Sequence, residues 1–317
     1  MKLINFLSSY MPKQKYSDLE EIKNIYESVK KIGYKKTSEK FNEHISLLER
    51  IVRRYEENME VKDMKVIIIA AGPSTRLRPL TEYKPKCLLE IEGKSILERT
   101  MDVFRHYGVD DFAIVRGYQK DKIDLPNISY YDNDDYYNNN ILESLFYAEE
   151  AMKDGFIFTY SDILYSKNVV KKLLDSPHDF SFIVDTDWRK RYEERTKHPT
   201  DEAELAIVEH GKIINLSKFY NPDDAYGEFI GLGKFSKKGA EILTRNYNRA
   251  KNNKTCKFEG RFHDATTMQK AYLTDMIEEL IFRGYSMHSV DVKGEWVEMD
   301  TDEDYEYAQQ LIRDGKI

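Results

Sequence analysis

The stretch VIIIAAGPSTRLRPLTEYKPKCLLEI, residues 66 to 91, combines small residues, hydroxyls and cations in an order that suits anion binding. It begins with a run of β-branched residues, which is typical of a buried parallel strand. Small residues follow, and they let a ligand approach the backbone closely. The loop after them supplies amides, hydroxyls and fixed positive charges, so we expect an anion cradle. Its residues are Ala70, Ala71, Gly72, Ser74, Thr75, Arg76 and Lys86.

This loop matches neither the dinucleotide motif GxGxxG nor the P-loop motif GxxxxGK[ST]. It resembles the signature A-A-G-x-G-[ST]-R-[LM]-x-P-L-T-x-x-x-P-K-x-[LM] of nucleotidyltransferases. These enzymes move a nucleoside monophosphate from a nucleoside triphosphate to a phosphorylated small molecule. Ser74 stands where that family usually has glycine. The resemblance implies that Arg76 meets the β- and γ-phosphates and that Lys86 bridges the α-phosphate and the acceptor.

Two aspartates are the predicted ligands of Mg²⁺, the cofactor that the resemblance implies. In nucleotidyl transfer an acceptor oxygen attacks the α-phosphorus, and a metal held by carboxylates stabilises charge on the phosphates. Asp162 follows the predicted strand Phe156 to Tyr160, and Asp300 lies in WVEMDTDEDYEYA, which resembles the family segment W-x-E-[IM]-D-[TS]-x-x-D. Taken singly, Asp162 could be a turn residue and Asp300 a helix cap. Their joint presence in family order favours the metal site.

The segment YYDNDDYYNNNILESL, residues 130 to 145, resembles a narrower group, the cytidylyltransferases that act on phosphocholine and on phosphonates. Its amides and hydroxyl could read a pyrimidine edge or the ribose, although an asparagine run is otherwise typical of a turn. We therefore expect CTP as the nucleotide. The predicted nucleotide-binding residues are Ala70, Ala71, Gly72, Ser74, Thr75, Arg76, Gly117, Tyr118, Asn140 and Ser144.

The acceptor is expected to bind the charged segment that begins at Asp185, which resembles the phosphonate branch of these enzymes. Arginines there would meet a phosphate or phosphonate, acidic residues an amine, and aromatic residues would flank it. The alternative is a charged surface loop with a buried tryptophan. The predicted substrate-binding residues are Asp187, Trp188, Arg189, Tyr192, Arg195 and Glu228.

These features predict a CTP-dependent cytidylyltransferase whose acceptor is a small phosphonate such as 2-aminoethylphosphonate. Phosphocholine, or another phosphorylated amine or amide, is the alternative acceptor. Two further alternatives remain open: a sugar-1-phosphate nucleotidyltransferase, and a DNA-binding regulator that senses a nucleotide.

Strands and helices alternate from Val66, which predicts an α/β fold with a doubly wound, mostly parallel, Rossmann-like sheet. Ligands in such sheets bind beyond the carboxyl ends of the strands. We therefore expect Gly72, Gly117, Asp162 and Asp185 to share one crevice. After Asp185 the pattern changes to antiparallel strands at 204–209, 213–216 and 229–235, followed by helices near 237–249 and 267–283.

Residues 1–63 precede the predicted catalytic domain, residues 64–317, and are expected to form a small all-α module. Three helices are predicted, from a cap at Ser17 and Asp18 to Gly33, near 37–41, and over 45–55, in an order that resembles a helix-turn-helix. Arg50, Arg53 and Arg54 could then face DNA. The module has 13 Lys and Arg against 11 Asp and Glu. This small excess of positive charge gives only weak support for DNA binding. Docking or homodimerisation is the alternative.

The composition sets outer limits on the function. The chain has 317 residues and a net charge of -7, which argues against generic coating of nucleic acid. Its two cysteines, Cys87 and Cys256, form no disulfide framework or metal-binding spacing. No apolar run approaches the length of a membrane span, so the expected setting is the cytoplasm.

Overall fold

The computed structural model describes residues 19–193, 195–197, 200–252 and 262–317. By its internal contacts the chain divides into two compact units. One consists of residues 1–63 with 105–109, and the other of residues 64–104 with 110–317. Each unit is described below by itself.

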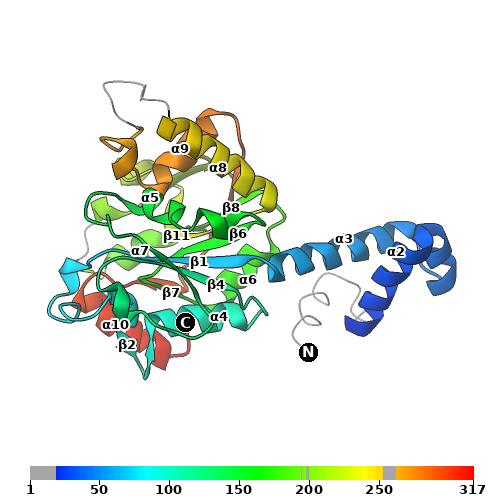
Figure 1. Ribbon diagram of the computed structural model, residues 1–317, viewed down its shortest axis with the longest axis horizontal. Coiled ribbons are helices and arrows are strands. Elements are labelled where there is room, and N and C mark those ends of the chain that lie inside the picture. The colour runs from blue at the N-terminus through cyan, green and yellow to red at the C-terminus, as the bar shows by residue number, and fades with distance from the viewer. Residues whose placement is uncertain (1–18, 194, 198–199, 253–261) are drawn as a thin grey trace. The chain divides into compact units, whose positions relative to one another are not determined.

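A mixed sheet forms the centre of the larger unit (Figure 1). Within the described residues it has nine strands in the order β5-β4-β1-β6-β11-β8-β12-β10-β9. Seven strands run in one direction, and β10 and β11 run against them. The strands are β1 (Lys65–Ala70), β4 (Phe112–Arg116), β5 (Ser129–Asp132), β6 (Phe156–Tyr160), β8 (Phe180–Asp185), β9 (Leu205–Glu209), β10 (Lys212–Ser217), β11 (Gly227–Phe235) and β12 (Met287–Val292). The predicted fold class is confirmed, including the antiparallel strands after Asp185.

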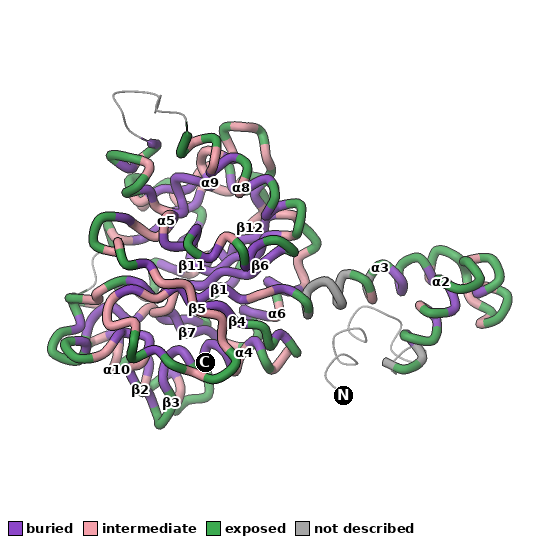
Figure 2. The backbone as a smooth tube through the Cα atoms, viewed as in Figure 1, coloured by how far each residue is buried: buried purple, intermediate pink, exposed green. Residues whose placement is uncertain are grey.

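Helices cover both faces of this sheet, as expected when strands are buried on both sides. One face packs with α5, α8 and α9 into a single apolar core, and Figure 2 shows the central strands buried. Figure 1 places α4, α6 and α10 on the other side. The helices are α4 (Ile96–Arg105), α5 (Ile141–Phe146), α6 (Lys167–Asp175), α7 (Trp188–Glu193), α8 (Lys237–Asn252), α9 (Leu273–Phe282) and α10 (Asp302–Arg313).

Two short strand pairs lie outside the main sheet. A hairpin joins β2 (Glu90–Ile91) and β3 (Lys94–Ser95), and β7 (Ile163–Tyr165) pairs antiparallel with β13 (Trp296–Glu298). In the second pair Ile163 lies opposite Glu298. This pairing brings the segment after β6 against the segment that contains Asp300.

The insertion of β11 between β6 and β8 depends on two glycines. A Cβ on Gly233 would lie 2.6 Å from the Phe158 ring and 2.7 Å from the Phe182 ring. Gly231 has φ +77°, and a Cβ there would lie 2.2 Å from the Tyr160 ring. The strand therefore needs glycine at both positions, and Gly231 leaves the space in which the Tyr160 ring lies.

The smaller unit is a helical hairpin in its described part. Helix α2 (Leu19–Phe41) contains a break at Gly33, whose φ of 80° and ψ of 164° are not helical, and α3 (Ile45–Lys62) follows. The hairpin is held by an apolar core of Ile22, Ile25, Leu48 and Ile51. The predicted break at Gly33 is present, but α3 continues seven residues beyond its predicted end.

Some expectations for this unit are corrected or stay open. Ile32 continues the helical spacing of Ile22 and Val29, but its side chain is 39% exposed. The predicted cap at Ser17 and Asp18 and the side chain of Arg54 lie outside the described part of the chain. Arg50 and Arg53 are exposed on α3, so contact with DNA or with another protein stays a prediction. In the described residues, no helix is both long and apolar enough for a membrane span.

Candidate active site

The cradle loop leaves β1 and bends sharply at Ser74. Ser74 is in the left-handed conformation, with φ 48° and ψ 54°, which glycine adopts most easily. The Thr81 hydroxyl donates to the Ser74 carbonyl oxygen at 2.7 Å and supports this turn. A serine is therefore accommodated where the resemblance implied glycine, and the loop still leads into a short 3-10 helix at Thr75–Leu77.

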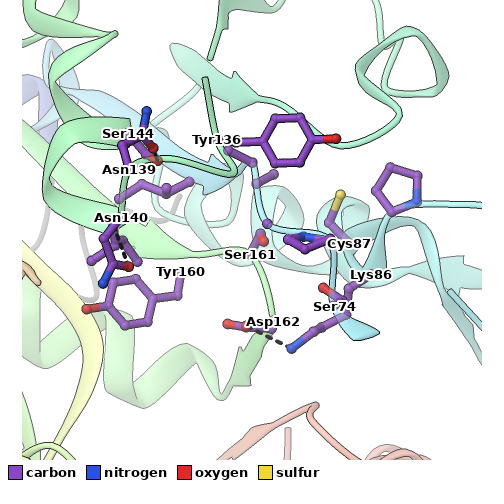
Figure 3. A pocket seen from close by; sticks show the side chains of 17 residues that line it. Ser74, Lys86, Cys87, Tyr136, Asn139, Asn140, Ser144, Tyr160, Ser161 and Asp162 are labelled. Atoms are coloured by element: carbon purple, nitrogen blue, oxygen red, sulfur yellow. Dashed lines mark hydrogen bonds and ion pairs between the residues drawn. The ribbon is translucent and has the colours of Figure 1, made fainter. Parts of the chain in front are cut away.

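Lys86 links the two predicted metal ligands. Its Nζ atom lies 3.0 Å from Asp162 Oδ2 and also contacts Asp300 Oδ1. Figure 3 shows Lys86 and Asp162 pointing toward each other at the edge of the pocket. Burial alone would lower the pKa of Lys86, but the two carboxylates raise it above its usual value, so the ammonium is charged.

A third carboxylate, Glu298, completes the acidic group. Asp162, Glu298 and Asp300 each offer an oxygen, and these oxygens lie within 4.8 Å of one another. Burial, and then the charges of Asp300 and Asp162, raise the pKa of Glu298 well above its usual range. Glu298 lies in the segment WVEMDTDEDYEYA, but no role was predicted for it. The glutamate of the family segment W-x-E-[IM]-D was the available signal.

This group fits a divalent cation by its chemistry. Oxygen ligands from carboxylates are those that Mg²⁺ prefers. In addition, Asp162 Oδ1 is buried and has no hydrogen-bond partner among the described residues. A buried carboxylate oxygen without a partner is costly unless a cation or water completes it.

Arg76 approaches the same group from the cradle. Its Nη2 atom lies 2.7 Å from Asp300 Oδ2, and its Nη1 atom pairs with Glu202. The side chain is about half exposed, so these carboxylates orient the guanidinium while one side remains open to solvent. A fixed guanidinium at this place can bind phosphate oxygens in bidentate fashion.

The nucleotide pocket lies beside the cradle, between the loop after β1 and the start of α5. Figure 3 shows Asn139, Asn140 and Ser144 on the side opposite Lys86. The pocket is lined by Ile69, Ala70, Ala71, Gly72, Pro73, Ser74, Pro85, Lys86, Cys87, Tyr136, Asn139, Asn140, Ile141, Ser144, Tyr160, Ser161 and Asp162. Most of the predicted nucleotide-binding residues therefore meet at one cavity.

A buried polar cluster forms the wall around Ser144. The side-chain amides of Asn133 and Asn139 donate to each other's carbonyl oxygens at 2.9 and 3.0 Å, and Asn133 also donates to the Ser144 hydroxyl at 2.9 Å. Asn140 caps α5 by accepting from the Ile141 amide at 2.8 Å. Asn133 and Asn139 were missing from the predicted set, and the signal for them was the asparagine-rich segment itself.

Gly117 and Tyr118, also predicted to bind the nucleotide, do not line this pocket. A Cβ on Gly117 would lie 2.6 Å from the Ala71 carbonyl oxygen, so this glycine serves close packing behind the cradle. The Tyr118 hydroxyl donates to the Glu82 carbonyl oxygen at 3.0 Å. Asp185 likewise leaves the expected crevice, because its carboxylate is fully buried and accepts from the Trp296 indole at 2.8 Å.

The six predicted acceptor residues also lie outside the lining of this pocket. Trp188 is buried in a small apolar cluster, and the Tyr192 hydroxyl donates to Glu228 Oε1 at 2.8 Å inside the protein. Arg195 donates to Asp304 Oδ1 at 2.7 Å, an internal ion pair with α10.

Two further residues of that set lie at the surface. Arg189 pairs with Asp223 at 3.4 Å, and Asp187 pairs with Lys190 at 2.9 Å. The alternative given above, a charged surface segment with a buried tryptophan, describes this region better.

A second pocket, here called the acceptor pocket, adjoins the nucleotide pocket and shares Lys86 and Asp162 with it. Its other walls carry charged and aromatic side chains from distant parts of the chain. It is lined by Pro73, Ser74, Thr75, Arg76, Lys86, Asn140, Ile141, Tyr160, Asp162, Glu204, Lys218, Tyr272, Glu298 and Asp300. Glu204 belongs to the charged segment that begins at Asp185 but was assigned no role. Lys218 and Tyr272 were not predicted, because no local pattern distinguishes them.

A cradle loop with fixed cations, a three-carboxylate group and two adjoining pockets on an α/β sheet define a nucleotidyltransferase. Residues 66–207 match the family model of the MobA-like NTP transferase domain. The resemblance to nucleotidyltransferases that the sequence indicated is thereby confirmed, and so is the enzyme class.

Several of the similar proteins are cytidylyltransferases by name, and others are named as a uridylyltransferase or as the bifunctional protein GlmU. The chain is 29% identical over 257 residues to CTP:phosphoglutamine cytidylyltransferase of Campylobacter jejuni. The aligned region covers 77% of this chain and 98% of that protein. It is 25% identical over 185 residues to 2-aminoethylphosphonate cytidylyltransferase of Lancefieldella rimae, covering 56% and 70%. Three other relatives are matched over only 50 to 56% of their own length.

Solved structures agree on the fold. CTP:phosphocholine cytidylyltransferase from Streptococcus pneumoniae superposes with a TM-score of 0.58 at 21% identity, covering 78% of this chain and 99% of that one.

Proposed function

We propose that the protein is a CTP-dependent cytidylyltransferase that transfers CMP to a phosphorylated small molecule and releases pyrophosphate. The observation that supports this most strongly is the contact of Lys86 with both Asp162 and Asp300 at the junction of the two pockets. The nucleotide pocket and the acceptor pocket meet at these residues, so a donor and an acceptor bound there would bring their phosphates together.

The reaction forms a bond between an acceptor oxygen and the α-phosphorus of CTP, and it breaks the bond to the bridging oxygen of pyrophosphate. Lys86 supplies a buried positive charge where charge develops on the α-phosphate. Arg76, half exposed on the cradle, supplies a second cation for the departing phosphates. Asp162, Glu298 and Asp300 would hold Mg²⁺. When bound, the metal would stabilise negative charge on the phosphate oxygens.

The preference for a pyrimidine is supported by the polar wall of the nucleotide pocket. Asn139 and Ser144 are both buried and carry an amide and a hydroxyl. The edge of cytosine offers an amino donor together with acceptors, which an amide and a hydroxyl can match. The name of the Campylobacter relative, which specifies CTP, points the same way.

For the acceptor we propose a phosphorylated amine or amide. The preference for 2-aminoethylphosphonate came from the charged segment that begins at Asp185, and the six substrate-binding residues assigned from it do not line the acceptor pocket. A phosphonate remains the second candidate, because the Lancefieldella relative is named for one.

The test is a pyrophosphate-release screen of CTP, UTP, ATP and dTTP against phosphorylated amines, amino acids, phosphonates and sugar-1-phosphates, with Mg²⁺. We expect CTP to exceed the other nucleotides by at least about tenfold in kcat/KM, because a polar pocket rejects bases that leave its groups unpaired. Turnover of UTP or dTTP with a sugar-1-phosphate would instead support the sugar-nucleotide alternative. No turnover with any pair would overturn the proposal and favour a nucleotide sensor.

A further inference from the structure

Two side chains of the acceptor pocket carry opposite charges close together. Lys218 follows β10, Glu204 precedes β9, and Lys218 Nζ lies 3.8 Å from Glu204 Oε1. This distance permits attraction but exceeds that of a hydrogen bond. Both charged groups can therefore still form hydrogen bonds with a bound molecule.

Glu204 is held in place from the protein side. Its side chain is only 8% exposed, and the Tyr160 hydroxyl donates to its Oε2 atom at 3.2 Å. Tyr160 itself is positioned by Gly231, whose missing side chain leaves room for the ring. A buried carboxylate with one hydroxyl partner and a more distant lysine is a strong site for an ammonium group.

Lys218 lies on an aromatic support. Its Nζ atom is 4.8 Å from the centroid of the Tyr272 ring, and its side chain is 30% exposed. An ammonium has three donors, and neither an aromatic face nor a carboxylate at 3.8 Å satisfies them with a hydrogen bond. A carboxylate of a bound acceptor would do so.

The position of Lys218 also disfavours an acceptor whose only charged group besides the phosphate is positive. A trimethylammonium or a lone ammonium would use an aromatic face, but Lys218 already lies over the Tyr272 ring. A second cation beside it would be repelled unless a carboxylate accompanied it. A group with both charges satisfies Lys218 and Glu204 together.

We infer that the phosphorylated acceptor carries an amino-acid group, whose carboxylate binds Lys218 and whose ammonium binds Glu204. This inference rests on the proposed cytidylyltransferase function and narrows its substrate class. Lys218 and Glu204 are then residues that determine specificity, whereas Lys86 and the three carboxylates act on the phosphates.

The test uses two pairs of acceptors in which only the carboxylate differs. O-phosphoserine is compared with phosphoethanolamine, and 2-amino-3-phosphonopropionate with 2-aminoethylphosphonate, in pyrophosphate release from CTP. We expect the wild-type enzyme to prefer the carboxylate-bearing member of each pair by about 10- to 100-fold in kcat/KM, the range for one charge-assisted hydrogen bond.

Two variants and a control assign that preference to Lys218. Lys218→Met should raise KM for the carboxylate-bearing member about 10- to 100-fold. It should leave KM for CTP unchanged and remove the preference within each pair. Lys218→Arg should restore most of the preference, which also shows that the site tolerates substitution. Lys212→Met is the matched control, because Lys212 is exposed and lies outside both pockets.

The outcomes separate this inference from the function on which it rests. Turnover with CTP that is equal for both members of each pair, or better without the carboxylate, overturns the amino-acid assignment alone. An equal loss of kcat/KM for both members of a pair in Lys218→Met also overturns the amino-acid assignment alone. Absence of turnover with CTP across all acceptors overturns the proposed function and the inference with it.

Discussion

The backbone amide of Met299 donates a hydrogen bond of 2.8 Å to the carbonyl oxygen of Asp162. This bond continues the pairing of β7 with β13 and fixes two segments that are far apart in the sequence side by side. The carboxylates on either side of Met299 are thereby held beside Asp162. The acidic group is thus built on paired backbone, which suits a site that must keep its geometry during turnover.

The carboxylates that flank this bond should be essential for turnover. Asp162→Ala and Asp300→Ala should each lower kcat by at least about 10²- to 10³-fold, because each removes negative charge from the metal site. The measurement is pyrophosphate release at saturating CTP over a range of Mg²⁺ concentrations. Circular dichroism should show an unchanged fold. A variant with near-normal kcat would remove that residue from the proposed ligands.

Lys86 should act mainly on the transition state. A buried cation that contacts the reacting phosphate gains most when charge develops there, so Lys86→Met should lower kcat by about 10²-fold or more. The change in KM for CTP should be smaller. Lys84→Met is the control, since Lys84 lies two residues away and lines neither pocket. A pure KM effect would reduce Lys86 to a binding residue.

Much of the fold could be predicted because it depends on local pattern. The buried runs of β1, β6 and β8 and the turn at His210 and Gly211 carry their own signals. The three-residue strand β7 and the short charged helix α7 do not, because they are stabilised by partners distant in sequence. Periodicity within a short window cannot report such partners.

The same distinction between local pattern and distant partners explains which site residues could be predicted. Asp162 and Asp300 stand in ordered motifs, so sequence reasoning found them, whereas Lys218 and Tyr272 meet only after β9, β10 and α9 have packed. Arg195 was assigned to the acceptor because its segment resembles the phosphonate branch and an arginine there could meet a phosphate or phosphonate. Its true partner, Asp304, lies 109 residues further along the chain.

Glu278 on α9 should make stability depend on pH. Burial raises the pKa of Glu278 from its ordinary value of 4.5 to about 7, while its Oε1 atom accepts from the Leu216 amide. A raised carboxyl pKa means that the folded state binds more protons between about pH 4.5 and 7. Stability contributed by this group is therefore present below pH 4.5 and is lost as pH rises to 7.

Glu278→Gln tests this dependence, because glutamine can still accept from the Leu216 amide but does not ionise. The variant should exceed the wild type in stability by up to about 3 kcal/mol at pH 8 and by much less at pH 4.5. Urea unfolding at both pH values measures the difference. Glu241→Gln, at an exposed site on α8, is the control. Identical pH dependence in both variants would show that Glu278 does not titrate in this range.

Catalysis should not require the smaller unit. A chain that begins at Met64 keeps the cradle, the three carboxylates and every strand of the described sheet. It loses helices α2 and α3, whose apolar residues form a core of their own. We therefore expect it to remain folded and to retain kcat within about twofold. Loss of folding would show that the boundary at Met64 is misplaced.

The same truncation serves as the control for the predicted contact with DNA. If exposed Arg50 and Arg53 on α3 meet phosphates, the full chain should bind a DNA duplex with an affinity that falls steeply with salt, and the truncated chain should not. Arg50→Ala and Arg53→Ala should each reduce the slope of log affinity against log salt by about one. The measurement is fluorescence anisotropy of a labelled duplex between 50 and 200 mM salt. If the full chain and the truncated chain bind equally weakly, DNA is excluded as the partner of this unit. If light scattering then shows a dimer for the full chain and a monomer for the truncated chain, the unit is assigned to homodimer contact.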